Sequence, residues 1–131
     1  MRTNTYNTLL RNTLLATVAL VAAGFIATTH AGSTETNYLT FNRDVALPGV
    51  VLPAGTYVFE IANPETSHDI VRVRTKDGRV HYMGFTLKVD RPAGLAANQP
   101  VSFREARPDL PVPIAAWFPL DSSSGRQFLY R

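Results

Sequence analysis

The sequence contains no cysteine, which limits how the protein can be held together. Small exported domains are often stabilised by disulfides, and this chain cannot form one. It also cannot carry a lipid on a mature N-terminus, because that attachment requires a cysteine. The fold must therefore depend on burial of apolar side chains, which at about 100 residues removes ~60–70% of the unfolded surface from water.

Long apolar runs are scarce as well. The clearest one, Thr13–Ala27, spans 15 residues, whereas a membrane-spanning helix needs ~20. A basic segment with Arg2 and Arg11 precedes it, and small residues at Thr29 and Ala31 follow it. This order is typical of a secretory signal peptide, and a membrane anchor is the alternative.

Cleavage after Ala31 would give a signal peptide over residues 1–31 and a single domain over residues 32–131, in the periplasm or outside the cell. The leader contains Arg2 and Arg11 and no acid, so the 13 basic residues fall to 11, against 10 acidic ones. Binders of nucleic acid or anionic membranes carry clustered Lys and Arg in clear excess. We therefore expect no nucleic-acid partner and no membrane association after cleavage.

Catalytic motifs are missing too. The sequence has no G-x-S-x-G elbow, no H-E-x-x-H, no phosphate-binding glycine loop and no calcium loop. Ser122–Ser124 precede Gly125, which is typical of a turn. The carboxylates of Glu60, Asp69 and Glu105 are scattered along the chain. We therefore expect no enzyme activity and no cofactor.

Short β-branched and aromatic runs recur between Gly, Pro and Asn signals, and no segment of the mature domain has a sustained apolar period of 3.6 residues. This pattern predicts an all-β fold: a two-layer antiparallel sandwich of about seven strands, with Greek-key, immunoglobulin-like or cupredoxin-like topology. Val45–Leu52 is expected to add a short edge strand, because Pro48 and Pro53 cannot donate ladder hydrogen bonds. The predicted strands are Asn37–Arg43, Thr56–Ala62, His68–Thr75, Val80–Val89, Val101–Ala106, Ile114–Phe118 and Gln127–Tyr130.

The segment Thr75–Arg79 is expected to be a hairpin turn, with Gly78 in the left-handed conformation. A two-residue loop would place Val73 opposite Tyr82. A three-residue loop with a bulge at Gly78 would place Arg72 opposite Tyr82 instead. The second register gives the cleaner apolar face, so we predict the three-residue loop.

This register has two consequences for candidate sites. It places Arg72 and Arg74 beside Tyr82 on the outer face, where a guanidinium can stack on an aromatic ring. It also places His81 near the inner face at the turn end, where we expect a rim residue with one hydrogen bond.

The run Gly55–Val71 resembles the strand–Asn–loop–His–strand segment of cupredoxin-like copper proteins, in which the histidine after the loop is a copper ligand. The resemblance implies that role for His68. A type-1 copper site needs a thiolate, and this sequence has none. A weaker Cu(II) or Zn(II) site of His68 and His81, with Asp69 as a third candidate ligand, is the alternative to a structural turn.

A longer resemblance involves two patterns: an early F-x-x-x-V-x-[LV]-P-G-x-x-L-P-A-G-T-Y-x-F and a late W-F-x(6)-G-x-x-F-x-Y. Together they resemble a group of small exported proteins from soil bacteria, which implies export and a β fold but no activity. The LPAGTY element is also similar to the turn and strand of transthyretin-like sandwich domains, where the tyrosine anchors the strand. The matching positions are Pro48, Gly49, Leu52 to Tyr57, Phe59, Trp117, Phe118, Gly125, Phe128 and Tyr130.

Trp117 and Phe118 are adjacent aromatics on a predicted strand, so one should enter the core and the other should face outward. In one interpretation, one aromatic fills the core and the other covers the end of the strand. In the other, the aromatics form an exposed ridge that binds a ligand. The candidate binding surface is Trp117, Phe118, Tyr82, Arg72 and Arg74, with an envelope protein or a glycan as the partner. The sequence thus predicts a non-catalytic binding or structural module, and the alternative is the metal-binding protein of His68 and His81.

Overall fold

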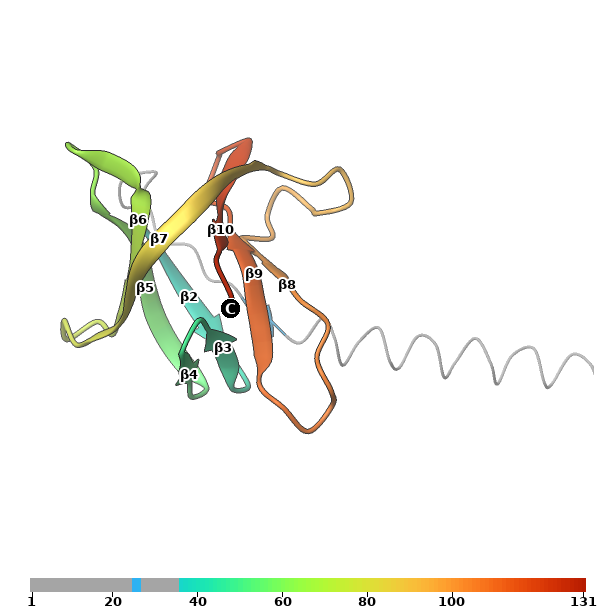
Figure 1. Ribbon diagram of the computed structural model, residues 1–131. Helices are drawn as coiled ribbons and strands as arrows, with labels where there is room; N and C mark the ends of the chain where they lie inside the picture. Colours follow the sequence, from blue (N-terminus) through green and yellow to red (C-terminus); the bar gives the residue numbers. More distant parts are fainter. Residues whose placement is uncertain (1–24, 27–35) are drawn as a thin grey trace, which may run out of the picture.

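The computed structural model describes residues 25–26 and 36–131, and all regular structure in these residues is β-strand (Figure 1). Only the backbone of Phe25–Ile26 belongs to the predicted signal peptide; the predicted cleavage site lies outside the described residues. This part of the chain contains no helix of the length and apolarity needed to cross a membrane.

The strands form one hydrogen-bonded path in the order β1-β2-β5-β6-β7-β10-β9-β3-β4, and β8 also pairs with β9. All pairs are antiparallel except β3 with β9. The strands are β1 (Phe25–Ile26), β2 (Thr36–Phe41), β3 (Val45–Leu47), β4 (Val50–Leu52), β5 (Gly55–Asn63), β6 (Ser67–Arg74), β7 (Val80–Asp90), β8 (Val101–Phe103), β9 (Val112–Trp117) and β10 (Ser124–Phe128).

The path folds into two layers because β7 is long enough to belong to both. Its first half pairs with β6 as far as Phe85, and its second half, from Thr86 onward, pairs with β10. Figure 1 shows β7 crossing from the layer of β2, β5 and β6 to the layer of β8, β9 and β10. The predicted all-β, sandwich-like fold is therefore confirmed.

All seven predicted strands are present, with ends that differ by no more than three residues. The single edge strand predicted over Val45–Leu52 is wrong, because the segment is a hairpin of β3 and β4. It reverses at Pro48–Gly49, where Gly49 has a φ of 75°, a value that glycine adopts without strain. β3 then pairs with β9 inside the sheet, and Pro48 and Pro53 lie outside the ladders.

The predicted register of β6 with β7 holds only next to the turn. Gly78 has a φ of 95°, as expected, and Arg74 lies opposite Val80. The register then shifts, so that Val73 lies opposite Tyr82. This is the pairing of the two-residue loop, and it reverses the face on which every later residue of β7 lies.

The physical reason for the shift is the fit of the inner face. Tyr82 now points inward and packs edge-on against Phe128, with ring centroids 5.6 Å apart. Gly84 lies opposite the buried Val71, and Thr86 is buried with its hydroxyl donating to the carbonyl of Asp69 at 2.7 Å. Tyr82, Gly84 and Thr86 therefore occupy the inner face of β7, and the alternate residues Met83, Phe85 and Leu87 face outward.

A polar residue lies at the centre of the core. Asn37 on β2 is only 1% exposed, and its Oδ1 accepts hydrogen bonds from Trp117 Nε1 at 3.0 Å and the Leu120 amide at 3.3 Å. The Trp117 ring packs on Phe59. The surrounding core is Leu39, Phe41, Val45, Leu47, Leu52, Tyr57, Phe59, Ile61, Val71, Val73, Val101, Ile114, Trp117 and Phe128.

We expect Asn37→Ala to lower the free energy of unfolding by about 2–4 kcal/mol, because it leaves the buried indole N–H and the Leu120 amide without an acceptor. Urea unfolding of Asn37→Ala, Trp117→Phe and the double variant measures the coupling. A coupling energy near zero would contradict this account of Asn37.

Candidate functional site

The outer face of β7 carries an exposed apolar stripe. Met83, Phe85 and Leu87 alternate along the strand and are 54%, 68% and 55% exposed. Outward positions of an antiparallel sheet that faces water are normally polar. Three consecutive outward apolar side chains therefore need an explanation.

Neighbouring strands extend the stripe sideways. Ile70 on β6 lies directly opposite Phe85. Leu129 follows β10 two residues after Gln127, which lies opposite Leu87, and it is 44% exposed. At ~200 Å² for each large side chain, the exposed apolar area is roughly 400 Å², within the range of patches that are often functional. We call Ile70, Met83, Phe85, Leu87 and Leu129 the apolar face.

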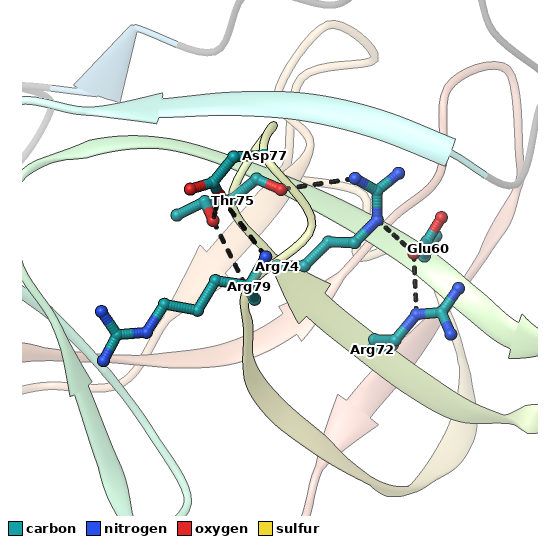
Figure 2. A network of polar contacts seen from close by, with 6 residues as sticks. All are labelled: Glu60, Arg72, Arg74, Thr75, Asp77 and Arg79. Atoms are coloured by element: carbon teal, nitrogen blue, oxygen red, sulfur yellow. Dashed lines mark hydrogen bonds and ion pairs between the residues drawn. The ribbon is translucent and has the colours of Figure 1, made fainter.

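A charged trio of Glu60, Arg72 and Arg74, drawn in Figure 2, borders the apolar face. The Nε atoms of Arg72 and Arg74 both donate to Glu60 Oε1, at 2.8 and 2.7 Å. Arg72 lies opposite Glu60 on one side and opposite Met83 on the other. The trio therefore belongs to the same outer surface as the stripe.

The trio continues into the hairpin turn. Arg74 Nη1 donates to the carbonyl of Thr75 at 3.3 Å. The Thr75 hydroxyl donates a hydrogen bond to Asp77 Oδ1, and the Arg79 amide donates to the same oxygen at 3.4 Å. The turn thus fixes the position of Arg74, as Figure 2 shows.

Glu60 is ionised at neutral pH. Burial by itself would raise the pKa of Glu60, but the hydrogen bonds from Arg74 and Arg72 outweigh burial and lower that pKa below its ordinary value. Among the outward positions of β2, β5, β6, β7 and β10, Glu60 is the only acidic side chain, and Arg72 and Arg74 are the basic ones. These strand positions carry one net positive charge, and Lys76, whose Nζ lies 5.6 Å from the centre of the outward Tyr38 ring, adds a second.

The structure does not bring the candidate metal ligands together. His68 lies near the start of β6, and His81 lies at the bulge opposite the end of β6. Five to six strand residues separate the two positions, or roughly 17–20 Å. Asp69 instead accepts a hydrogen bond from Arg126 at 2.9 Å. No group of three metal-binding side chains occurs in the described residues, and the metal-site alternative of His68 and His81 is not supported.

His81 has an unusual environment of its own. Its ring meets the Tyr57 ring edge-on at 5.6 Å, and its buried Nε2 has no hydrogen-bond partner among the described residues. The Tyr57 hydroxyl donates its proton to the Pro53 carbonyl at 2.6 Å, so it cannot also donate to Nε2. This last contact anchors the LPAGTY turn, as the sequence suggested.

The structure buries the aromatic pair of the predicted binding surface. Trp117 and Phe118 are 0% and 1% exposed. Strand alternation would turn Phe118 to the face opposite Trp117, but β9 ends at Trp117. Phe118 therefore lies outside the strand and packs against Gly125. The guanidinium of Arg91 covers the Phe118 ring at 5.0 Å. Both aromatics are therefore unavailable to a ligand.

Of the five residues in that predicted surface, Arg72 and Arg74 lie on the outer face, while Tyr82 packs against the core. The sequence-based hypothesis missed Phe85 and its neighbours, because an alternating apolar set looks the same whether it faces inward or outward. The one available signal was the opposite set, in which Gly84 and Thr86 are small.

Comparison with known proteins finds no matching family model, no similar curated protein and no similar solved structure at a significant level.

We expect Glu60→Gln to lower the free energy of unfolding at pH 7 by about 1–2 kcal/mol, because the guanidiniums lose a charged acceptor. The pKa of Glu60 is lowered in the folded state, so its contribution is present above the unfolded value of about 4.3 and is lost as the pH falls through the lower folded value. Urea titrations between pH 3 and 7 should therefore converge for wild type and variant at low pH.

The matched control for Glu60→Gln is Asp109→Asn, which removes the acid of an exposed ion pair with Arg107. It should cause no measurable change, because exposed pairs contribute little. Profiles that stay parallel for wild type and Glu60→Gln from pH 3 to 7 would contradict the ionised trio.

We expect His81→Phe to leave the free energy of unfolding unchanged or raise it by up to about 2 kcal/mol, because it removes an unsatisfied buried nitrogen and keeps a ring against Tyr57. His81→Ala, which also removes the ring contact, should destabilise. Thermal unfolding at pH 7 compares the two. A loss above about 1 kcal/mol in His81→Phe would show that Nε2 has a stabilising partner in solution.

Proposed function

We propose that this protein is a non-catalytic binding module of the periplasm or cell exterior, and that it binds its partner through the apolar face and its charged border. The observation that carries the proposal is the exposure of Met83, Phe85 and Leu87. Single exposed apolar residues are common on protein surfaces. A contiguous set on a sheet face is a liability in water, so its presence points to a partner that covers it.

The ionisable groups near the core support a non-catalytic role. Glu60 forms ion pairs with Arg72 and Arg74, and Asp69 forms one with Arg126. The Tyr130 hydroxyl donates to the carbonyl of Ile114 at 2.7 Å, and burial raises the pKa of Tyr130 to about 12. Neither Glu60, whose pKa is lowered, nor Tyr130 is poised to exchange a proton near pH 7, as a catalytic acid or base must.

The hollow beside Arg43 and Asp44 also suits this role. Its volume is about 210 Å³, smaller than the ~300 Å³ at which small-molecule pockets begin. This hollow is therefore not favoured as a site for a small substrate. Export is supported by the signal-peptide pattern.

We expect the double variant Phe85→Ser/Leu87→Ser to lose the partner without losing stability. Both side chains are exposed, so the free energy of unfolding should change by less than about 0.5 kcal/mol. The measurement is capture from an envelope extract of the producing cells by immobilised protein. Components held by wild type should be absent from the double-variant eluate.

The matched control is Val51→Ser, which removes an exposed apolar side chain from β4, away from the apolar face. It should capture the same components as wild type. Identical capture by all three proteins would refute the apolar face as the binding surface.

A further inference from the structure

We propose that the partner is a polypeptide segment that covers the apolar face with its own apolar side chains and presents a carboxylate to Arg72. This inference rests on the proposed function and deepens it, since it names the chemistry of the partner. Three features carry it: the position of Arg72, the charge of the outer surface, and the size of the apolar face.

Arg72 is placed to bind a second carboxylate. It lies in one cross-strand row between Glu60 and Met83, so it stands at the boundary of charged and apolar surface. Its Nε binds Glu60, while its side chain remains 33% exposed. The two terminal nitrogens have no hydrogen-bond partner among the described residues, and a guanidinium presents them as a fork that matches a carboxylate.

The charge of the trio favours an acidic partner. One carboxylate faces two guanidiniums, and the low pKa of Glu60 keeps that carboxylate ionised at neutral pH. The surplus is one positive charge next to Met83. A carboxylate from the partner would neutralise it, with a hydrogen bond assisted by charge on both sides.

The same count argues against other occupants. Recognition of an anionic lipid surface takes clusters of about 4–8 basic residues, and the described outer face offers fewer: Arg72, Arg74 and Lys76 over Tyr38. A second copy would bring Arg72 to a face whose sole acid, Glu60, is already held by two arginines. A glycan needs many hydrogen-bonding groups, which Met83, Phe85 and Leu87 do not offer.

The size of the apolar face suits a protein partner. A standard interface removes about 800 Å² from each side, of which ~56% is apolar. That fraction corresponds to ~450 Å², close to the roughly 400 Å² of the apolar face. Arg72, Gln127 and His68 lie around the face and can supply its polar rim.

The test uses the protein expressed from its full sequence and purified as the cell delivers it. A random 12-residue peptide library is displayed and selected on wild type, and enriched peptides are titrated against Phe85→Ser and Arg72→Gln. The matched controls are Val51→Ser and Arg107→Gln, an arginine that is 79% exposed and lies off the outer face. Enriched peptides should combine apolar residues with Asp or Glu.

We expect Phe85→Ser and Arg72→Gln each to weaken peptide binding at least tenfold, and the two controls to leave it unchanged. Replacing the peptide acid by its amide should weaken binding to wild type at least tenfold and have little further effect on Arg72→Gln. Because the amide change leaves the protein intact, it separates binding from folding. Binding should also weaken with added salt.

The inference and the proposed function fail in different ways. If peptide binding depends on Phe85 but not on the acid or Arg72, the acidic partner is refuted and the binding face stands. Phe85-dependent binding to vesicles with 30% anionic phospholipid, or a Phe85-dependent dimer in light scattering, would replace the peptide with a lipid surface or a second copy. If neither peptides, vesicles nor self-association depends on Phe85, the proposed function is overturned.

Discussion

The Asn37 amide lies inside the apolar core and accepts hydrogen bonds from Trp117 and the Leu120 amide. These groups come from opposite ends of the described chain, so this contact joins the two layers that β7 connects. A buried donor without an acceptor costs free energy. Any other placement of Asn37 would leave the Trp117 indole N–H and the Leu120 amide without this acceptor. β9 ends at Trp117, which bonds Asn37, and the next residue, Phe118, packs on Gly125 under Arg91.

The register of β7 decides both the packing of the core and the composition of the outer surface. Its bulge beside the hairpin turn decides which of two alternating sets enters the core. Tyr82, Gly84 and Thr86 face inward because they fit against Phe128, Val71 and the Asp69 carbonyl. The displaced set, Met83, Phe85 and Leu87, then forms an apolar surface on the outside. The proposed binding face is thus a direct result of how the core is packed.

Charged side chains lie along the border of that face. Glu60 holds Arg72 and Arg74 in fixed positions through their Nε atoms. This keeps the guanidinium of Arg72 at the edge of the apolar stripe, with its terminal nitrogens unpaired among the described residues. Arg72 and Arg74 were expected on this surface from strand alternation alone. Their partner was not, because Glu60 meets them only after β5 and β6 pair.

The sequence by itself determined the all-β class, the strand positions to within three residues, the Gly78 turn and the Tyr57 anchor, since these depend on local propensity, turn chemistry and a contact four residues away. Only the tertiary structure decided the register of β7, the hairpin at Pro48–Gly49, the separation of His68 from His81 and the burial of Phe118. Each of these depends on which side chains meet across strands. Period-two alternation shows that a strand has two faces, but only packing against the rest of the core selects the one that is buried.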